Sequence, residues 1–199
     1  HMPTGEALLY KEYPLEIVRQ RLEPYQRLLT ILQSTNKTSQ LTYEQLAYKN
    51  HIHFFRDIIS HDRTAIVLYP NYTTNLHQHI TEKHRLNETE CRNLFSQIVR
   101  AVQMCHRVGL IVRDLKLRKI IFNDQNHSHL LLTGIDESIM LSTPTTTDDL
   151  VSSRFSCPVY ACPEIVLNRQ MYSGKMADSW SLGTFSSNFP TYLNDCILI

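Results

Sequence analysis

The chain has 199 residues, with 20 basic and 19 acidic side chains and a formal charge of +1. This length allows one domain of ordinary size or two small lobes. The composition, 42% hydrophobic and 20% charged, is that of a globular protein. The near-zero charge argues against a protein that mainly binds phosphate backbones, so we expect no nucleic-acid partner. Only 5 glycines are present, and their spacing excludes a glycine-rich phosphate loop within the chain.

No window approaches the roughly 18 consecutive apolar residues of a membrane span, and the N-terminus lacks an apolar signal core. We therefore expect no membrane partner, and we interpret the scattered cysteines as reduced thiols. The histidines form no H-E-x-x-H motif, and no two cysteines have the C-x-x-C spacing. The sequence therefore predicts no metal site.

The N-terminal part is predicted to combine strands with one long helix. Three strands are expected, at residues 5–13, 51–59 and 64–69. The segment 15–33 has helical spacing, and Pro24 inside it should break or kink the helix.

The most regular helix of the sequence covers residues 88–108, whose apolar side chains recur at three- and four-residue intervals. Asn87 is a suitable N-cap, Glu90 is its expected capping-box partner, and Gly109 fits the position that ends the helix. A short helix is predicted at 76–83. Because strands and helices do not alternate, the pattern disfavours a doubly wound parallel sheet.

Two short apolar runs follow the long helix and predict a β-hairpin, with strands at 120–122 and 130–132. Residues 142–156 are polar, contain Pro144 and predict a long surface loop.

The tetrapeptide Arg113-Asp-Leu-Lys116 lies between the long helix and the hairpin, which is the context of a protein kinase catalytic loop. Cys162-Pro-Glu164 stands where kinases have Ala-Pro-Glu, and Asp178-Ser-Trp180-Ser-Leu-Gly183 stands where they begin a central helix. Lys11 lies on a strand before the first helix, where the nucleotide-binding lysine of a kinase belongs. Four such motifs in kinase order favour a kinase-like fold.

Several motif positions depart from an active kinase. Val112 replaces the histidine of His-Arg-Asp, Lys119 replaces the metal-binding asparagine, and Gly134 replaces the metal-binding aspartate. Lys119 also places a positive charge where a cation should lie. A shifted alignment would instead make Asp136 the metal ligand, with Glu137-Ser138 in place of Phe-Gly.

These departures, with several longer stretches, resemble the Tribbles pseudokinases. The matching stretches include Leu22-Glu-Pro-Tyr-Gln-Arg-Leu28, Gly109-Leu-Ile-Val-Arg-Asp-Leu-Lys-Leu-Arg-Lys119 and Tyr172-Ser-Gly-Lys-Met-Ala-Asp-Ser-Trp-Ser-Leu-Gly183. The resemblance implies an α+β, bilobal, protein-kinase-like fold. We expect it to be incomplete, with a small β-rich N-lobe that lacks its first strands and a mainly helical C-lobe that lacks its last helices.

The resemblance also implies a division of the chain. Residues 1–75 would form the partial N-lobe, 76–183 the partial C-lobe, and 184–199 a tail without homology. Since the helix that begins near Asp178 normally anchors the whole C-lobe, we expect apolar surface to be exposed.

For function, the resemblance implies a catalytically inactive scaffold that docks protein substrates such as CCAAT-enhancer-binding transcription factors. In the full-length family a ubiquitin E3 ligase and a mitogen-activated protein kinase kinase are further partners. No cofactor is expected, although weak ATP binding without Mg²⁺ is compatible with the motifs. The resemblance places such a protein in the nucleus and cytoplasm.

The motif residues are expected to fall into three groups. Lys11, Asp114 and Lys116 would be vestigial catalytic residues, and Lys119 and Gly134 degenerate metal positions. The structural motif would comprise Arg113, Glu164, Asp178 and Trp180. Lys11 is interpreted as a surface lysine, with an ion pair to Glu23 as an alternative.

Two other interpretations of the chain stay open at this point. One is a weak, metal-independent serine/threonine kinase-like ATP binder that uses Lys11, Asp114 and Lys116. The other is a product without function that quality control recognises.

Overall fold

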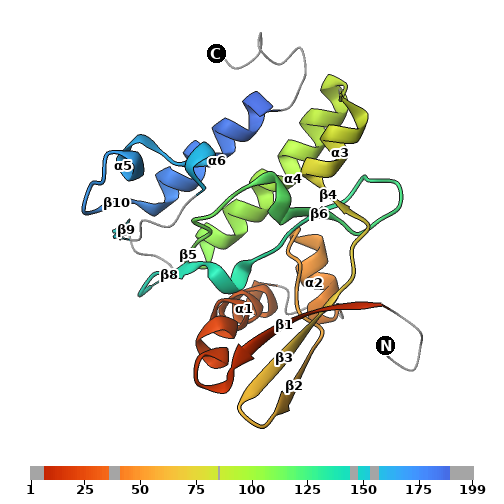
Figure 1. Cartoon of the computed structure of the whole chain (residues 1–199), viewed down its shortest axis with the longest axis vertical. Helices are drawn as coiled ribbons and strands as arrows, with labels where there is room; N and C mark the ends of the chain where they lie inside the picture. The colour runs from red at the N-terminus through yellow and green to blue at the C-terminus, as the bar shows by residue number, and fades with distance from the viewer. Residues whose placement is uncertain (1–6, 36–40, 85, 144–147, 153–156, 189–199) are drawn as a thin grey trace.

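The computed structural model describes residues 7–35, 41–84, 86–143, 148–152 and 157–188. Its N-terminal part is a small sheet beside a long helix, and its C-terminal part is mainly helical (Figure 1). The elements of the N-terminal part are β1 (Leu8–Pro14), α1 (Leu15–Thr35), α2 (Tyr43–Lys49), β2 (Asp57–His61) and β3 (Thr64–Pro70).

The sheet of the N-terminal part is antiparallel, with strand order β1-β3-β2. Lys11 of β1 lies opposite Val67 of the central strand. Strand β3 alternates buried and half-buried residues, so Val67 and Tyr69 join the core that also contains Tyr25 and Leu28 of α1. The long helix therefore covers one face of the sheet, and its buried residues belong to a core that continues into the C-terminal part.

The sequence predicted that Pro24 would break or kink the first helix, but the helix is not broken there, because α1 continues through Pro24 to Thr35. A proline inside a helix loses one backbone hydrogen bond. Here Leu22, Pro24 and Tyr25 are all buried, and the packing of this helix face offsets that loss.

The strand predicted at residues 51–59 begins only at Asp57. In the preceding segment, His51 and His53 bond to the distant Leu132, and only Arg56 N–H already donates to Leu68 of β3, at 2.7 Å. Leu132 N–H donates to the His51 carbonyl at 2.8 Å, and His53 N–H donates to the Leu132 carbonyl at 2.9 Å. The sequence also missed α2, which a reciprocal capping box of Thr42 and Gln45 begins.

The C-terminal part is built around α4, which lies at its centre (Figure 1). Its elements before the hairpin turn are β4 (Thr74–Asn75), α3 (Leu76–Lys83), α4 (Glu88–Arg107), β5 (Leu110–Ile111), the 3-10 helix η1 (Leu117–Lys119) and β6 (Ile120–Phe122). The elements after it are β7 (Leu130–Leu132), η2 (Ile135–Glu137), β8 (Ile139–Met140), β9 (Leu150–Val151), η3 (Pro158–Tyr160), α5 (Pro163–Val166), β10 (Tyr172–Ser173) and α6 (Gly174–Asn188).

The predicted long helix and the hairpin are both confirmed. Asn87 accepts a hydrogen bond from the Glu90 N–H, and Gly109 has a positive φ of 75° directly after the helix. The Glu90 side chain, however, pairs with Lys83 at 2.7 Å instead of closing a capping box. Strands β6 and β7 pair antiparallel, as expected.

The predicted surface loop at 142–156 contains a short strand, β9, which pairs with β10. Asp149, just before β9, links this strand to β10 and to the start of α6, because its carboxylate accepts hydrogen bonds from the Ser173 hydroxyl and the Lys175 N–H. Pro144 lies outside the described residues.

Asp178, fully buried on α6, anchors the predicted catalytic loop. Its carboxylate accepts hydrogen bonds from the backbone N–H groups of Val112 and Arg113, each at 2.8 Å. His106 of α4 also contacts it, at 2.8 Å. One buried carboxylate therefore joins α4, α6 and the loop.

Helix α6 continues to Asn188 and so crosses the boundary expected at Gly183. Met176 and Trp180 on this helix are 69% and 50% exposed, which fits the expected apolar surface. Among the described helices, none is both long and apolar enough to cross a membrane.

The start of α6 gives a test of this packing. A Cβ atom on Gly174 would lie 2.8 Å from two side-chain carbons of Ile111, whereas one on Gly183 would have no neighbour within 4 Å. We expect Gly174→Ala to lower the free energy of unfolding by about 1–3 kcal/mol. Gly183→Ala in the same helix should be neutral or stabilising by up to about 1 kcal/mol. Urea unfolding measures both, and equal effects of the two substitutions would contradict this packing.

Candidate functional site

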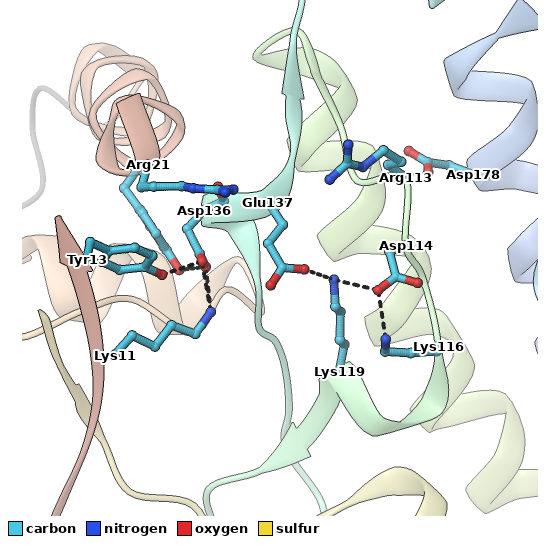
Figure 2. Close-up of polar contacts among 11 residues, drawn as sticks. Lys11, Tyr13, Arg21, Arg113, Asp114, Lys116, Lys119, Asp136, Glu137 and Asp178 are labelled. Atoms are coloured by element: carbon cyan, nitrogen blue, oxygen red, sulfur yellow. Dashed lines mark hydrogen bonds and ion pairs between the residues drawn. The ribbon is translucent and has the colours of Figure 1, made fainter. Parts of the chain in front are cut away.

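The site lies where β1 and α1 meet the hairpin and the catalytic loop, and two clusters of charged side chains make it up (Figure 2). In the first cluster, the Lys11 ammonium lies 2.9 Å from both carboxylate oxygens of Asp136. The Tyr13 hydroxyl donates to the same carboxylate at 2.6 Å. Asp136 belongs to η2, so this contact joins the N-terminal sheet to the segment that follows the hairpin.

The surroundings of Asp136 keep it ionised although it is only 4% exposed. Burial by itself raises the pKa of this carboxyl, but the Lys11 charge and the hydrogen bonds from Lys11 and Tyr13 outweigh burial and hold the pKa below its ordinary value. Burial and the hydrogen bond to Asp136 raise the pKa of Tyr13 well above its ordinary value, so its hydroxyl stays a donor.

This arrangement corrects the expectations for Lys11. The lysine side chain is 39% exposed, but its ammonium is held by Asp136 and not by Glu23. Glu23 is exposed and lines a cleft with Pro24 and Arg21.

The second cluster is a chain of alternating charges. The Lys119 ammonium lies 2.6 Å from a carboxylate oxygen of Glu137 and 3.1 Å from one of Asp114. The Lys116 ammonium lies 2.8 Å from the same oxygen of Asp114. Figure 2 shows Lys119 between the two carboxylates. Two lysines and two acids therefore balance one another within the chain.

Gly134 completes this cluster by leaving room for Lys119. Its φ of 79° lies in the left-handed region, and a Cβ atom built on it would lie 3.2–3.3 Å from the end of the Lys119 side chain. The lysine stem thus fills the space that an aspartate side chain at position 134 would enter.

The residues present do not fit a divalent cation. The described part of the chain contains no group of three or more histidine, cysteine, aspartate or glutamate side chains that could hold a metal ion. The two carboxylates nearest the expected position, Asp114 and Glu137, are both bonded to the Lys119 ammonium. A metal ion there would lie beside a positive charge without an aspartate ligand from position 134.

Asp114 is poorly suited to act as a general base. Burial raises its pKa, but hydrogen bonds from Lys116 and Lys119 together with their charges lower it below the ordinary value. The Asp114 N–H also donates to the Val112 carbonyl at 2.8 Å, so the residue forms part of the loop's own framework.

The remaining predicted residues lie around these two clusters. Arg113 has a positive φ of 70° and lines the cleft of about 610 Å³ that also borders Lys11 and Arg21. Glu164 lies in the first turn of α5, where its own backbone N–H and Cys162 lower its pKa. Trp180 is half-exposed and is not part of either cluster.

Sequence reasoning missed Tyr13, Arg21 and Glu137 as members of the site. Tyr13 could have been found, since it follows Lys11 by two residues and therefore shares its face of the strand. Arg21 reaches the Asp136 carbonyl at 3.4 Å from α1, across 115 positions of sequence. No local pattern indicates that contact.

The contact between Gly134 and Lys119 predicts a coupled pair of substitutions. Gly134→Ala should lower the free energy of unfolding by about 1–3 kcal/mol, because the new Cβ crowds Lys119 and the backbone is left-handed. In a Lys119→Asn background the loss should shrink by at least about 0.5 kcal/mol, since the shorter side chain removes the crowding. A double-mutant cycle by urea unfolding measures this coupling, and additive effects would show that the lysine does not fill the space.

Comparisons with known proteins agree with this geometry. A family model described as the protein kinase domain matches residues 31–190. Tribbles homolog 3 of Homo sapiens is 34% identical over 183 residues, which cover 92% of this chain and 45% of that protein. Tribbles of Drosophila melanogaster is 36% identical over 194 residues, covering 90% of this chain and 38% of that protein.

Tribbles homolog 2 of Bos taurus is 32% identical over 183 residues, covering 92% of this chain and 47% of its own length. The chain thus spans less than half the length of these curated relatives. The resemblance expected from the catalytic-loop and α6 motifs is confirmed, and the α+β kinase-like fold with it. The chain belongs to the protein kinase domain family, and within that family it resembles the Tribbles proteins.

Proposed function

We propose that this chain is a catalytically inactive kinase-like adaptor, which docks a protein substrate and does not phosphorylate it. One observation carries the proposal: the Lys119 ammonium lies between Asp114 and Glu137, with its stem against Gly134. An internal cation therefore lies where a kinase would need Mg²⁺.

Phosphoryl transfer depends on divalent cations that neutralise the charge developing on the phosphates. Binding one here would bring a second cation next to Lys119 and would gain no aspartate at position 134. The lysine expected to contact the nucleotide phosphates, Lys11, is also engaged, because both oxygens of Asp136 hold its ammonium. Both clusters satisfy their charges without a ligand.

Docking a peptide requires only a complementary surface. Large apolar side chains are exposed on the elements that follow the catalytic loop, namely Val159, Val166, Leu167, Met176 and Trp180. We infer that these exposed side chains, on or next to η3, α5 and α6, form the docking face that contacts the substrate. The substrate class that the Tribbles resemblance implies is a peptide of a CCAAT-enhancer-binding transcription factor, which would place the protein in the nucleus and cytoplasm. A ubiquitin E3 ligase and a mitogen-activated protein kinase kinase are proposed as partners of the full-length protein.

A weak, metal-independent nucleotide site is the second candidate. The cleft of about 610 Å³ has Lys11, Arg21 and Arg113 in its lining, and three cations favour an anionic ligand. Asp136 and Glu137 line the same cleft, however, and compete with phosphate for these cations.

One pair of measurements separates the two candidates. For the adaptor, we expect a fluorescent transcription-factor peptide to bind and Val166→Asp/Leu167→Asp to weaken its affinity at least about tenfold. Ile59→Asp, at an exposed apolar position on β2, is the control and should leave the affinity unchanged. Transfer of radiolabelled phosphate from ATP to the peptide should not exceed that of a Lys11→Met variant.

Peptide phosphorylation that depends on Lys11 would overturn the assignment as an inactive adaptor. Absence of binding by the unmodified chain, or equal losses in both apolar variants, would overturn the docking face.

A further inference from the structure

The irregular segment between α2 and β2, residues 50–55, forms a direct backbone link from the N-terminal part to the hairpin. Ile52 forms an isolated parallel bridge with Leu132 of β7. The two flanking backbone hydrogen bonds join Leu132 to His51 and His53. Three histidine side chains, those of His51, His53 and His129, surround this link.

His51 and His129 make a reciprocal pair of contacts across the link. The His51 Nδ1 atom lies 3.1 Å from the carbonyl oxygen of Leu130 on β7. The His129 Nε2 atom, from the residue just before β7, lies 3.1 Å from the carbonyl oxygen of Tyr48 on α2. Their rings lie 4.7 Å apart, and the Tyr48 ring stacks on His129 with a centroid distance of 3.9 Å.

Both acceptors in this pair are carbonyl oxygens, so each ring must donate. A neutral imidazole meets that need with one proton, on Nδ1 of His51 and on Nε2 of His129. A second proton adds no partner in the pair. It places a full charge 4.7 Å from the other ring, and in His51 that charge is buried.

The charged and titratable groups around the pair come from three elements. His51 faces Arg100 of α4 as well as His129, and both disfavour a charge on it. Asp124, in the hairpin turn, accepts hydrogen bonds from the N–H groups of Ser128 and His129. Tyr48 is the titratable group on the α2 side.

His53 holds the other side of the segment. It is 5% exposed, and its Nε2 atom lies 2.9 Å from the carbonyl oxygen of Pro70 at the end of β3. Its ring stacks on Tyr69 and meets Tyr72 edge-on. Besides burial, the positive charge of Lys11 on β1 disfavours protonation of His53.

We propose that His51, His53 and His129 form an acid-sensitive joint between the two parts of the fold. When the His51 and His53 rings are neutral, the contacts of the three histidines fasten residues 50–55 to β7 on one side and to Pro70 on the other. Protonation of His51 and His53 releases this segment and loosens the contact between the parts, while helix α4 stays folded.

The direction of the pH dependence follows from the burial of the rings. Burial lowers the pKa of His51 below its ordinary value and that of His53 to about 4. The released segment has ordinary histidines, with a pKa near ~6.5, and therefore binds more protons than the fastened one. The fastening is complete above pH ~6.5 and is lost progressively as the pH falls toward the lower, fastened-state values.

Hydrogen exchange of the backbone amides tests the joint on the full chain. Rates for residues 48–56 and 128–133, corrected for intrinsic exchange, are compared at pH 7.5 and pH 5.5. We expect protection to fall at least about tenfold, which is the factor that one ordinary histidine contributes at pH 5.5. Protection of α4 should change much less.

A triple variant keeps the hydrogen-bond donors and replaces the three rings, including the two whose protonation releases the segment. His51→Asn keeps a donor near Nδ1 and tolerates the positive φ of 61° at this position, and His53→Gln and His129→Gln keep donors near Nε2. This variant should show less than about a twofold change in protection with pH. His61→Asn, at the exposed end of β2, should behave as the unmodified chain.

Three results would each overturn the proposal. They are unchanged protection of the unmodified chain at pH 5.5, an equal loss in the triple variant, and a loss in α4 as large as that in the joint.

Discussion

The ammonium of Lys119 is the charge on which the candidate site depends. It forms ion pairs with two acids from different segments, Asp114 of the catalytic loop and Glu137 of η2. It also packs against Gly134, whose missing side chain makes the close approach possible. In an active kinase a metal ion holds the catalytic loop and the segment after the hairpin in place. Here the same two segments are linked by a side chain that is always present.

An ion pair within the chain also attaches the N-terminal part to η2. Lys11 and Tyr13 of β1 bind Asp136, which lies next to Glu137 in η2. Adjacent residues of one short helix thus receive cations from both directions, Lys11 from the sheet and Lys119 from η1. Buried ion pairs are weak evidence for stability, because desolvation opposes the attraction, but removing one partner leaves a costly charge. The two lysines therefore specify the arrangement of η2 more than they strengthen the fold.

Local patterns in the sequence predicted the elements whose partners are close in the chain. The helix at 88–108 has its own periodicity and caps, and the hairpin pairs within 13 positions. Prediction failed where distant contacts decide the conformation. Residues 51–56 have a strand-like composition, yet the backbones of His51 and His53 bond to the distant Leu132. Pro24 is kept in α1 by burial of the surrounding face.

The residues of the candidate site also fall into those that the sequence could predict and those that it could not. Motif order located Asp114, Lys119 and Gly134, because a fold that keeps its loop order keeps those positions. The partner of Lys11 lies 125 positions away, and no local pattern identifies it. The histidines of the proposed joint are a further example, since His51 and His129 belong to segments with no motif and meet only in the folded chain.

We propose that Lys119 takes the place of a divalent cation at this site, and thermal unfolding in the presence of ATP can decide whether it does. The melting temperature is measured with ATP alone, with ATP and Mg²⁺, and with ATP and a chelator. The Lys119 arrangement predicts the same melting temperature in the second and third conditions. A Mg²⁺-dependent rise of more than about 2 °C, which only binding to the folded chain produces, would contradict it.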